Sequence, residues 1–570
     1  MRYLAFACDY DGTLATEGVV ADHVLDALKR LRDSGRRLCL VTGRELDDLR
    51  RVFPALDLFD RVVAENGAQV FTPESREERL LAEAPPARFV ELLRARGVQP
   101  ISVGRVIVAT WEPHENVVLD SIRDLGLELQ VIFNKGAVMV LPTGVNKAAG
   151  LRAALKDLHL SAHNTVAVGD AENDHALLAE CEVGVAVENA LPMLKERADW
   201  VTTGARGDGV VELIERMLAS DLQELAPRLA RAEIELGHDQ RDAPVTVHAY
   251  GRRLLLTGTS GSGKSTLTTS FVERLAEKHY QFCLIDPEGD YTAFEDTIVL
   301  GDEETAPKIE EVVDLLIAGD KNVVVNMLGV PLEQRSAFFA PLLARLMESR
   351  TRSGRPHWIV VDEAHHMLPE GHVILADALE HLPAGMMLIT VHPERLAARI
   401  LSRIDMLLVV GEEPEDAFQA FARSTGQSAP HVGDGALAAG EVLVWSPAVG
   451  AQVVRMRATP PKAERRRHRR KYAQGSLGED SSFYFRGPEG ALNLRAHNLA
   501  LFLQIADGVD DATWLHHLRQ HDYSQWLREA IKNPALADQV YELERQPDLD
   551  ARASRGKIRE AIEKIYTLPA

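Results

Sequence analysis

The feature that most constrains the fold is an alternation of short apolar runs with helix-like stretches, which occurs twice along the chain. Strands that alternate with helices indicate parallel sheets covered on both faces. In the first series the predicted strands are Leu4–Cys8, Arg37–Val41, Arg61–Ala64 and Thr165–Val168, and the predicted helices include Val24–Asp33 and Ala148–Leu158. The second series begins at Arg253 and continues to about Val454. We therefore expect an α/β protein with two such regions.

Length and composition exclude several classes of protein. A chain of 570 residues is too long for one ordinary core. The formal net charge of −21 excludes a general nucleic-acid coat. Cys8, Cys39, Cys181 and Cys283 form no CxxC pair, which fits a reducing cytosol. No apolar run is long enough to span a membrane, and the first residues lead directly into an acidic motif instead of a signal peptide. We expect a cytoplasmic protein without a membrane partner.

Acidic, hydroxyl and amino side chains follow the predicted strands of the first region. Ligands of open α/β sheets bind at the carboxyl ends of strands. There, carboxylates can hold Mg²⁺ or act as nucleophiles, while a hydroxyl and an ammonium group can bind phosphoryl oxygens. The residues at these positions are Asp9, Asp11, Thr42, Lys147, Asp170 and Asp174. This combination favours phosphoryl transfer.

These residues also match four ordered motifs of the haloacid dehalogenase (HAD) phosphatases, which residues 1–218 resemble. The motifs are Asp9-Tyr-Asp-Gly-Thr13, Thr42, Lys147 and Gly169-Asp170-Ala-Glu-Asn-Asp174. Further matches at Glu65–Ala68, Gly184–Ala190 and Gly207–Val210 resemble the Cof-type branch, whose cap is inserted between motifs two and three. The resemblance implies a Rossmann-like core at 1–71 and 141–220, with a small α/β cap at about 72–140.

The same resemblance assigns roles to the motif residues. Asp9 is the implied nucleophile, and Asp11 protonates the leaving group and then activates water. Asp9, the Asp11 carbonyl and Asp170 are implied Mg²⁺ ligands, with Asp174 in or beside that shell. Thr42 and Lys147 bind the phosphoryl group. Members of the family act on small phosphorylated metabolites, and the cap usually decides which. The candidate cap residues are Arg105, Trp111, His114, Asn134 and Lys135, although each one alone is more often an ordinary cap residue.

A phosphate-binding loop opens the second region, predicted at 246–460. It follows the apolar run Leu254–Thr257 and matches GxxxxGK[ST] in a strand–loop–helix context. Its residues are Gly258, Thr259, Ser260, Gly261, Ser262, Gly263, Lys264, Ser265 and Thr266. Backbone amides of such a loop cradle phosphates, Lys264 would reach the β- and γ-phosphates of ATP, and Ser265 would bind Mg²⁺.

A Walker B pattern follows about 95 residues later, where the apolar run ending at Val361 leads into Asp362 and Glu363. We expect Asp362 in the Mg²⁺ shell and Glu363 to polarise the attacking water. Polynucleotide kinases share the GxSGSGKST loop, and some are fused to a HAD phosphatase, but they rarely carry Asp-Glu-Ala-His at this position.

Two segments resemble the HerA/FtsK-like ATPases more closely. Asp286-Pro-Glu-Gly-Asp-Tyr291 is similar to a signature of that family, and Met386–Thr390 is similar to its sensor strand, with His392 in place of the usual Gln. The resemblance implies a homo-oligomer, typically a hexameric ring, with an arginine finger from a neighbouring subunit. The candidate fingers are Arg395, Arg399 and Arg403. No obvious DNA-threading insertion is present, which argues against a processive DNA motor.

The remaining segments carry weaker signals. We predict a helical linker at 221–245, a basic linker at 461–475 and a helical module at 476–570. Lys462–Lys471 can bind nucleic acid in a salt-dependent manner, or can be a solvated linker. In the module, His517 and His521 are one helical turn apart, whereas adjacent His516 and His517 make a poor metal pair.

We therefore predict a bifunctional enzyme that contains a Mg²⁺-dependent phosphatase and an ATPase, with ATP binding or hydrolysis regulating the phosphatase. One alternative is nucleic-acid end processing, in which the P-loop domain acts as a kinase or motor. Another is an ATP-gated assembly that senses a phosphorylated metabolite with little turnover.

Overall fold

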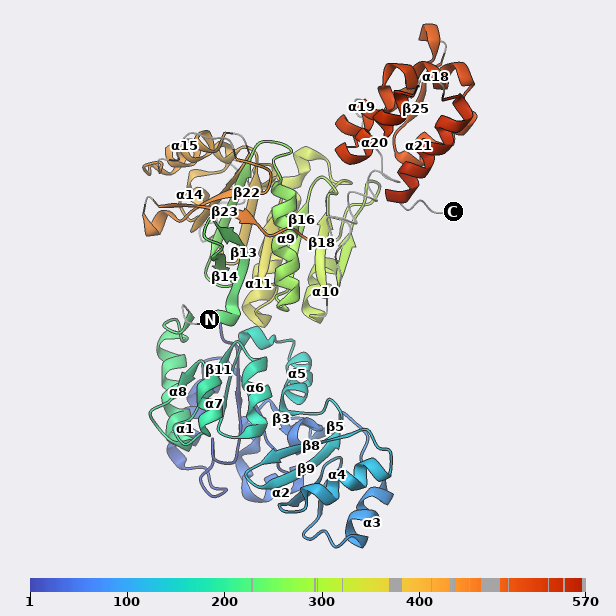
Figure 1. The fold of residues 1–570 in the computed structure, drawn as a ribbon. Coiled ribbons are helices and arrows are strands. Elements are labelled where there is room, and N and C mark those ends of the chain that lie inside the picture. Colours follow the sequence, from blue (N-terminus) through green and yellow to red (C-terminus); the bar gives the residue numbers. More distant parts are fainter. Residues whose placement is uncertain are drawn as a thin grey trace. The chain divides into compact units, whose positions relative to one another are not determined.

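The computed structural model divides the chain into two compact units, Met1–Thr459 and Pro460–Ala570 (Figure 1). The residues described are 1–226, 229–291, 294, 296–319, 321–368, 382–411, 413–430, 432, 437–450, 452–462, 482–490, 492–531, 533–546 and 549–565. The basic run from Ala463 to Lys471 lies outside them, so its proposed contact with nucleic acid stays a prediction. Within the described residues, no helix is long and apolar enough to cross a membrane.

The N-terminal part of the first unit contains an eight-stranded sheet in the order β12-β11-β10-β1-β2-β3-β4-β5. Its strands are β1 (Ala5–Cys8), β2 (Arg37–Val41), β3 (Arg61–Ala64), β4 (Gln69–Thr72), β5 (Glu77–Leu80), β10 (Thr165–Gly169), β11 (Val183–Ala186) and β12 (Trp200–Val201). The strands from β12 to β3 are parallel, whereas β4 and β5 are antiparallel additions. The four predicted strands are confirmed as β1, β2, β3 and β10.

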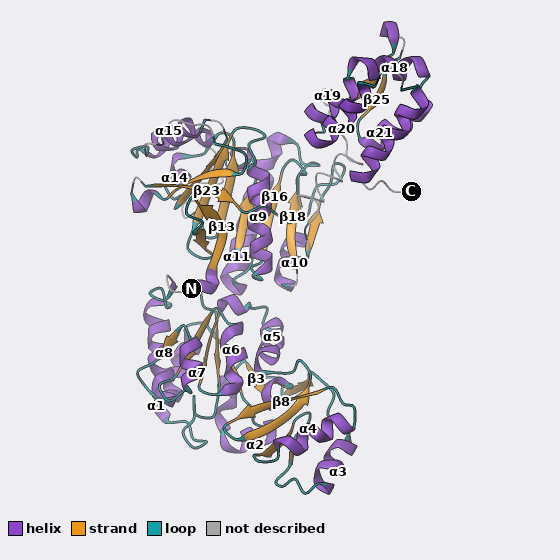
Figure 2. Ribbon diagram, in the orientation of Figure 1, coloured by secondary structure: helices purple, strands orange, loops and turns teal. Residues whose placement is uncertain are grey.

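Helices flank this sheet (Figure 2). They are α1 (Asp22–Asp33), α2 (Leu46–Val52), α5 (Lys147–Asp157), α6 (His175–Glu180), α7 (Pro192–Arg197) and α8 (Arg206–Ser220). In α1 the apolar positions recur with helical spacing, so that Val24, Leu28 and Leu31 are all buried. The two predicted helices are confirmed as α1 and α5.

A separate four-stranded antiparallel sheet lies in the region predicted as the cap, in the order β6-β7-β9-β8. It consists of β6 (Ser102–Val103), β7 (Val108–Trp111), β8 (Leu129–Asn134) and β9 (Ala137–Pro142), with α3 (Ala87–Ala95) and α4 (Glu115–Asp124). The expected cap start near residue 72 is wrong. A tight turn at Glu65–Gly67 returns β4 antiparallel to β3, and β5 pairs with β4, so both strands belong to the core sheet.

The second part of this unit contains an eleven-stranded sheet in the order β14-β13-β23-β22-β21-β15-β20-β19-β16-β18-β17. Its parallel section consists of β15 (Arg253–Gly258), β16 (Phe282–Asp286), β17 (Thr297–Leu300), β18 (Asn322–Asn326), β19 (Trp358–Val361), β20 (Met386–Thr390) and β21 (Met406–Val410). The antiparallel edge consists of β13 (Glu233–Asp239), β14 (Pro244–His248), β22 (Glu441–Trp445) and β23 (Val453–Ala458). Helices α9 (Lys264–Glu277), α10 (Ile309–Ala318), α11 (Arg335–Ser353), α12 (Ala364–Met367), α14 (Ala398–Leu401) and α15 (Pro414–Thr425) accompany it.

The expected helical linker at 221–245 is wrong. Glu233-Ile-Glu-Leu236 alternates between polar and apolar side chains, and Ile234 and Leu236 are buried while the two glutamates are half-buried. A period of two is the pattern of a strand. The segment accordingly forms β13, which pairs with β14 and joins the second sheet through β23.

A buried polar cluster joins the two parts of the first unit. The Glu182 carboxylate, whose side chain has no exposed surface, accepts hydrogen bonds from Arg2 at 2.8 Å and from Tyr280 at 3.0 Å. The His163 ring contacts the same carboxylate through Nδ1 at 2.7 Å. Its Nε2 contacts the Lys278 carbonyl at 2.8 Å, at the C-terminal end of α9. Because Tyr280 and Lys278 follow α9, this helix is anchored directly on the N-terminal part.

The second unit is mainly helical, as predicted. It contains α17 (Leu499–Gly508), α18 (Asp511–Gln520), α19 (Asp522–Glu529), α20 (Pro534–Glu544), α21 (Ala551–Ile565) and a two-stranded sheet of β24 (Phe483–Phe485) and β25 (Leu494–Ala496). Its core is rich in aromatic rings, including Phe485, Phe502, Trp514 and Tyr523.

Candidate active sites

The predicted acids of the N-terminal part meet at one edge of its sheet. Asp9 follows β1 and Asp170 follows β10, and these strands are neighbours. Carboxylate oxygens of Asp9, Asp170 and Asp174 lie within 4.8 Å of one another, and all three residues are buried. The carboxyl ends of parallel strands have therefore brought together residues separated by about 160 positions in the sequence.

Lys147 lies at the centre of this cluster. Its Nζ is 2.5 Å from Asp9 Oδ1 and 2.7 Å from Asp174 Oδ1. Asn146 caps α5 by accepting a hydrogen bond from the Ala149 amide, which fixes Lys147 as the first helical residue. The lysine is fully buried, so its charge is balanced by these two carboxylates.

Burial and mutual repulsion set the protonation of the cluster. Burial, reinforced by the Asp174 carboxylate, raises the pKa of Asp9, although Lys147 opposes this shift. Burial also raises the pKa of Asp170. Burial disfavours the charged lysine, but Asp174 and Asp9 outweigh it and raise the pKa of Lys147. Lys147 therefore partly offsets the burial and repulsion that disfavour the ionised form of Asp9.

Asp11 lies beside the cluster and is held by Arg44. The guanidinium donates two hydrogen bonds of 2.7 Å, one to each carboxylate oxygen of Asp11, and a third of 2.6 Å to Asp48. Thr42 accepts a hydrogen bond from the Arg44 amide at 3.1 Å, so its hydroxyl belongs to the same loop. Arg44 is therefore a site residue, and the sequence motifs gave it no role.

Glu65 connects the cap to the core, and the sequence analysis missed this role. Its buried carboxylate accepts three backbone hydrogen bonds, from Arg105, Val106 and Ile107, at 2.7–2.9 Å. A carboxylate with several amide donors is a strong local anchor. In the sequence, this role is indicated only by the position of Glu65, an acid that directly follows the apolar strand Arg61–Ala64.

Of the five cap candidates, all of which lie among the described residues, Lys135 alone contacts the carboxylate cluster. Its Nζ is 2.7 Å from Asp170 Oδ2 and 3.3 Å from the Asp11 carbonyl. Arg105 instead pairs with Glu78, and His114 contacts the Gln99 carbonyl. Trp111 is largely exposed.

The donor set fits Mg²⁺. Buried carboxylate and carbonyl oxygens are the ligands that hard divalent cations prefer. In this structure the ammonium groups of Lys147 and Lys135 lie against the Asp9, Asp170 and Asp174 carboxylates, which shows that the cluster attracts cations. Asp9, Asp170 and the Asp11 carbonyl would hold the metal, with Asp174 beside it.

The phosphate-binding loop connects β15 to α9, as predicted. Gly258, Gly261 and Gly263 all have positive φ, and a side chain at Gly258 would collide with the Val410 carbonyl. Lys264 donates to the carbonyls of Gly258 and Thr259 at 3.0 and 2.8 Å, so its ammonium lies across the loop. The Ser262 hydroxyl is shielded from solvent without a partner among the described residues. An unpartnered donor in a loop of this shape fits a phosphate.

Asp362 and Glu363 lie at the end of β19, which is separated from β15 by β20. Tyr291 donates to Asp362 at 3.0 Å, and Asp286 accepts the Tyr291 amide, so the Asp286–Tyr291 segment packs against the Walker B residues. Burial raises the pKa of Asp362 to about 7 and also raises that of Glu363. Glu363 has a left-handed backbone with φ of 42°, which is strained for a residue with a side chain.

The predicted sensor and finger residues follow β20. His392 contacts Glu394 through Nδ1 at 3.0 Å, while the buried His365 contacts Thr390 on the sensor strand. Arg395, Arg399 and Arg403 are all exposed. Within the described residues, none of the three arginines forms a hydrogen bond or ion pair with Asp362 or Glu363.

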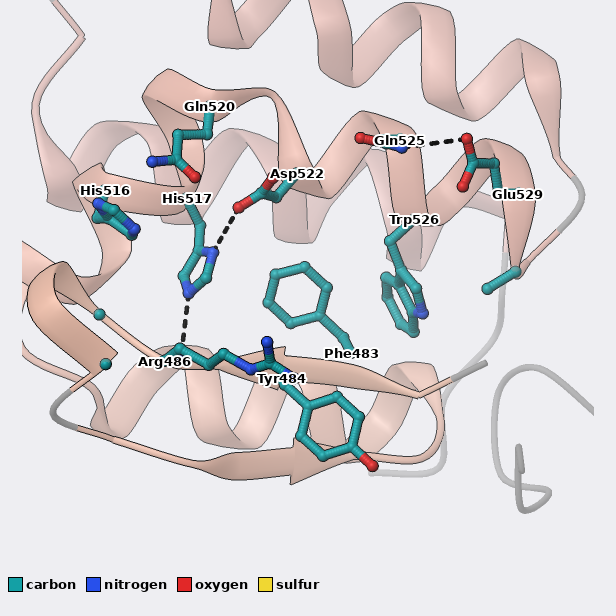
Figure 3. Close-up of a pocket in the computed structure, with 13 residues that line it drawn as sticks. Phe483, Tyr484, Arg486, His516, His517, Gln520, Asp522, Gln525, Trp526 and Glu529 are labelled. Carbon is teal, nitrogen blue, oxygen red and sulfur yellow. Dashed lines mark hydrogen bonds and ion pairs between the residues drawn. The ribbon is translucent and has the colours of Figure 1, made fainter. Parts of the chain in front are cut away.

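The second unit contains a cavity of about 600 Å³ (Figure 3). His517 lies in its wall, between the Asp522 carboxylate at 2.7 Å and the Arg486 amide at 3.0 Å. Both ring nitrogens are thus engaged within the fold. His521 instead contacts Glu544, so the His517–His521 pair is not assembled as a metal site.

Comparisons with known proteins agree with the two sites. A family model described as haloacid dehalogenase-like hydrolase matches residues 6–104 and 119–214, and an AAA-domain model matches 248–401. A phosphoglycolate phosphatase of Saccharolobus solfataricus is 30% identical over 226 residues, which are 38% of this chain and 92% of that protein. One of Methanosarcina acetivorans is 30% identical over 38% of this chain and 96% of that protein. A 5-amino-6-(5-phospho-D-ribitylamino)uracil phosphatase of Bacillus subtilis is 28% identical over 36% of this chain and 93% of that protein.

The chain therefore belongs, through its N-terminal domain, to the haloacid dehalogenase-like hydrolases. A P-loop ATPase-type domain and a helical region follow that domain. The architecture combines a phosphatase with an ATPase in one chain.

Proposed function

We propose that the N-terminal domain hydrolyses small phosphate monoesters through a covalent phosphoaspartate, with Mg²⁺ as its metal. The observation that supports this most directly is the buried cluster of Asp9, Lys147, Asp170 and Asp174 at the carboxyl ends of β1 and β10. Mg²⁺ would neutralise the phosphoryl oxygens when bound.

In the proposed reaction, an Asp9 oxygen attacks phosphorus and the bond from phosphorus to the ester oxygen breaks. Asp11 gives its proton to the leaving oxygen. Water then attacks the phosphoaspartate, Asp11 takes a proton from that water, and inorganic phosphate leaves. Lys147 orients Asp9 and balances its charge, and Thr42 binds the phosphoryl group. Because Arg44 holds both oxygens of Asp11 here, Asp11 has to release at least one of those hydrogen bonds to reach a leaving group.

The proposed substrate is a small phosphorylated acid of the phosphoglycolate type. Several relatives carry the name phosphoglycolate phosphatase. Lys135 of the cap region also places a positive charge beside Asp170. A cap of the Cof type, inserted after motif two, is part of this proposal.

The test compares full-length wild type with Asp9→Asn on phosphoglycolate, a sugar phosphate and a 5′-phosphorylated oligonucleotide, with Mg²⁺ and with EDTA. We expect Mg²⁺-dependent release of phosphate, best from the small acid, and loss of at least ~10³-fold in Asp9→Asn. Lys264→Ala, which leaves this site intact, is the matched control. Equal rates in Asp9→Asn and wild type would contradict the proposed mechanism, and preference for the oligonucleotide would favour end processing.

We further propose that the second domain is a HerA-like ATPase. The packing of Asp286–Tyr291 against Asp362 supports this proposal. Lys264 and Ser265 would bind the phosphates and Mg²⁺, and Glu363 would polarise water. The exposed arginines 395, 399 and 403 suit an arginine finger in a homo-oligomer. Light scattering with and without ATP tests whether the protein forms an oligomer. The rate of ATP hydrolysis by Lys264→Ala and by Arg395→Ala, mixed with wild type, tests the roles of these two residues.

Coupling between the two sites is the final part of the proposal. Helix α9 begins at Lys264, and Lys278, which caps its C-terminal end, contacts His163 of the phosphatase domain. Helix α5 begins at Lys147, and shortly after its end the Leu160 carbonyl accepts a hydrogen bond from Arg355. Each active site is thus linked to the domain interface by one rigid helix.

The coupling is tested by measuring phosphatase turnover with and without ATP, in wild type and in Lys264→Ala. We expect ATP to change the wild-type rate by several-fold, within the usual range of coupling energies, and to leave Lys264→Ala unchanged. Identical rates in all four conditions would contradict the coupling while leaving both activities intact.

A further inference from the structure

Lys135 occupies an unusual place in the cap. It lies in the tight turn between β8 and β9, with a φ of 49° that disfavours residues with side chains. Its ammonium reaches across to the core and contacts Asp170 Oδ2 at 2.7 Å and the Asp11 carbonyl at 3.3 Å. The side chain is 46% exposed, whereas that of Asp170 is 2% exposed. A backbone strained in this way, which holds the Lys135 ammonium against the buried Asp170, is typical of a functional residue.

The core leaves space for this contact at Gly12. A Cβ atom there would lie 2.6 Å from the Lys135 ammonium and 2.4 Å from Asp170 Oδ2. The Asn189 amide donates to the Gly12 carbonyl at 2.8 Å and holds the loop in place. The lysine therefore enters through a gap that only a glycine provides.

The two oxygens that Lys135 contacts are also the ones that fit a divalent cation. An ammonium and Mg²⁺ cannot share Asp170 Oδ2 and the Asp11 carbonyl without strong repulsion. Lys147 does not compete in this way, because it is buried between two other carboxylate oxygens. Of the two lysines, the exposed one on the cap is the one that can leave.

We propose that Lys135 is the specificity residue of the phosphatase. Metal binding displaces its ammonium from Asp170, and the freed group then binds the second anionic group of the substrate, the one that is not transferred. This inference rests on the proposed phosphatase function and adds the residue that recognises the substrate's second anionic group, which is a carboxylate or a further phosphate. Two other cations, Arg44 and Arg105, are held by carboxylates away from Asp170, since Arg44 binds Asp11 and Asp48, and Arg105 pairs with Glu78.

The first test measures metal binding without turnover. Full-length Lys135→Gln is titrated calorimetrically with Mg²⁺, without nucleotide and in a Ser265→Ala background that weakens the ATPase metal site. We expect about fivefold to tenfold tighter binding than in the parent, because the competing ammonium is gone. Lys29→Gln, at an exposed position in α1, should match the parent, and Asp170→Asn should bind far more weakly. Affinity that is unchanged or weaker in Lys135→Gln would overturn the exchange.

The second test separates specificity from general damage. We expect Lys135→Gln to lower kcat/KM for phosphoglycolate by about tenfold or more, mainly through KM. The kcat/KM for p-nitrophenyl phosphate should change by no more than about twofold. Lys135→Arg should restore part of the loss. An equal loss on both substrates would overturn the specificity role. A wild type that hydrolyses neither compound would contradict the proposed phosphatase function instead, and the metal titration would still decide whether Lys135 and Mg²⁺ compete.

Discussion

The phenol of Tyr280 donates a 3.0 Å hydrogen bond to the buried carboxylate of Glu182, and this bond crosses from the ATPase domain to the phosphatase domain. The His163 ring stacks on Tyr280 with a centroid separation of 3.8 Å and contacts the same carboxylate. Tyr280 lies just beyond α9, which begins in the phosphate-binding loop. Movement of that helix on ATP binding would therefore act on a buried charge in the other domain.

Replacing Tyr280 with Phe tests this relationship. The change removes one donor to a buried carboxylate and keeps the ring, so we expect a loss of stability of about 1.5–3 kcal/mol. Each activity should persist separately, while the effect of ATP on the phosphatase weakens. The measurement is phosphatase rate against ATP concentration, with Tyr484→Phe in the C-terminal unit as the control. A Tyr280→Phe protein that keeps the full ATP response would exclude this contact as the link.

Gly12→Ala should abolish the phosphatase with little effect on the ATPase. Gly12 has a φ of +87°, and an added Cβ would lie 2.4 Å from Asp170 Oδ2. The loop that carries Asp9 and Asp11 must then shift, which displaces the nucleophile. A loss of 10²-fold or more in kcat is the expected scale for such a displacement. Gly35 has a similar positive φ and open space around it, so Gly35→Ala is a control for backbone strain alone.

Much of this site could be predicted from the sequence, because a strand–loop–helix motif fixes where its loop residues lie relative to the sheet. Asp9, Lys147 and Asp170 follow strands or open helices, so their meeting at one edge follows from parallel pairing. Glu65 received no role, and Lys135 could not be distinguished from the other four cap candidates. The partners of both residues lie on a different sheet, and no local pattern predicts a cap–core contact. The β13 hairpin was missed because charged residues with helical propensity outweighed a short period-two alternation in the prediction.

Glu65→Gln should loosen the cap. The carboxylate accepts three amide hydrogen bonds from residues 105–107, and a neutral amide keeps only one acceptor oxygen. We expect a rise in KM and faster hydrogen exchange of the Val106 and Ile107 amides, with a loss of about 1–3 kcal/mol in stability. Exchange mass spectrometry measures this directly. Glu77→Gln, an exposed position in β5, should leave exchange in this loop unchanged.

His357 makes the first unit sensitive to acid. Burial, with His163, Arg355 and Arg350 nearby, lowers the pKa of His357 well below its usual 6.5. Its Nδ1 accepts the Gln281 amide at 2.8 Å, which requires a ring that is unprotonated at that nitrogen.

Below pH 6.5 the unfolded chain therefore binds a proton that the folded chain excludes, so stability falls as pH falls. The loss between pH 7 and pH 5.5 is about 1 kcal/mol for one such group. In His357→Asn an amide oxygen can take the place of Nδ1 and nothing titrates, so the midpoint of denaturant unfolding should change less over that range. The exposed His279→Asn should behave as wild type. If the free energy of unfolding depended on pH equally in His357→Asn and wild type, His357 would be protonated equally in the folded and unfolded states.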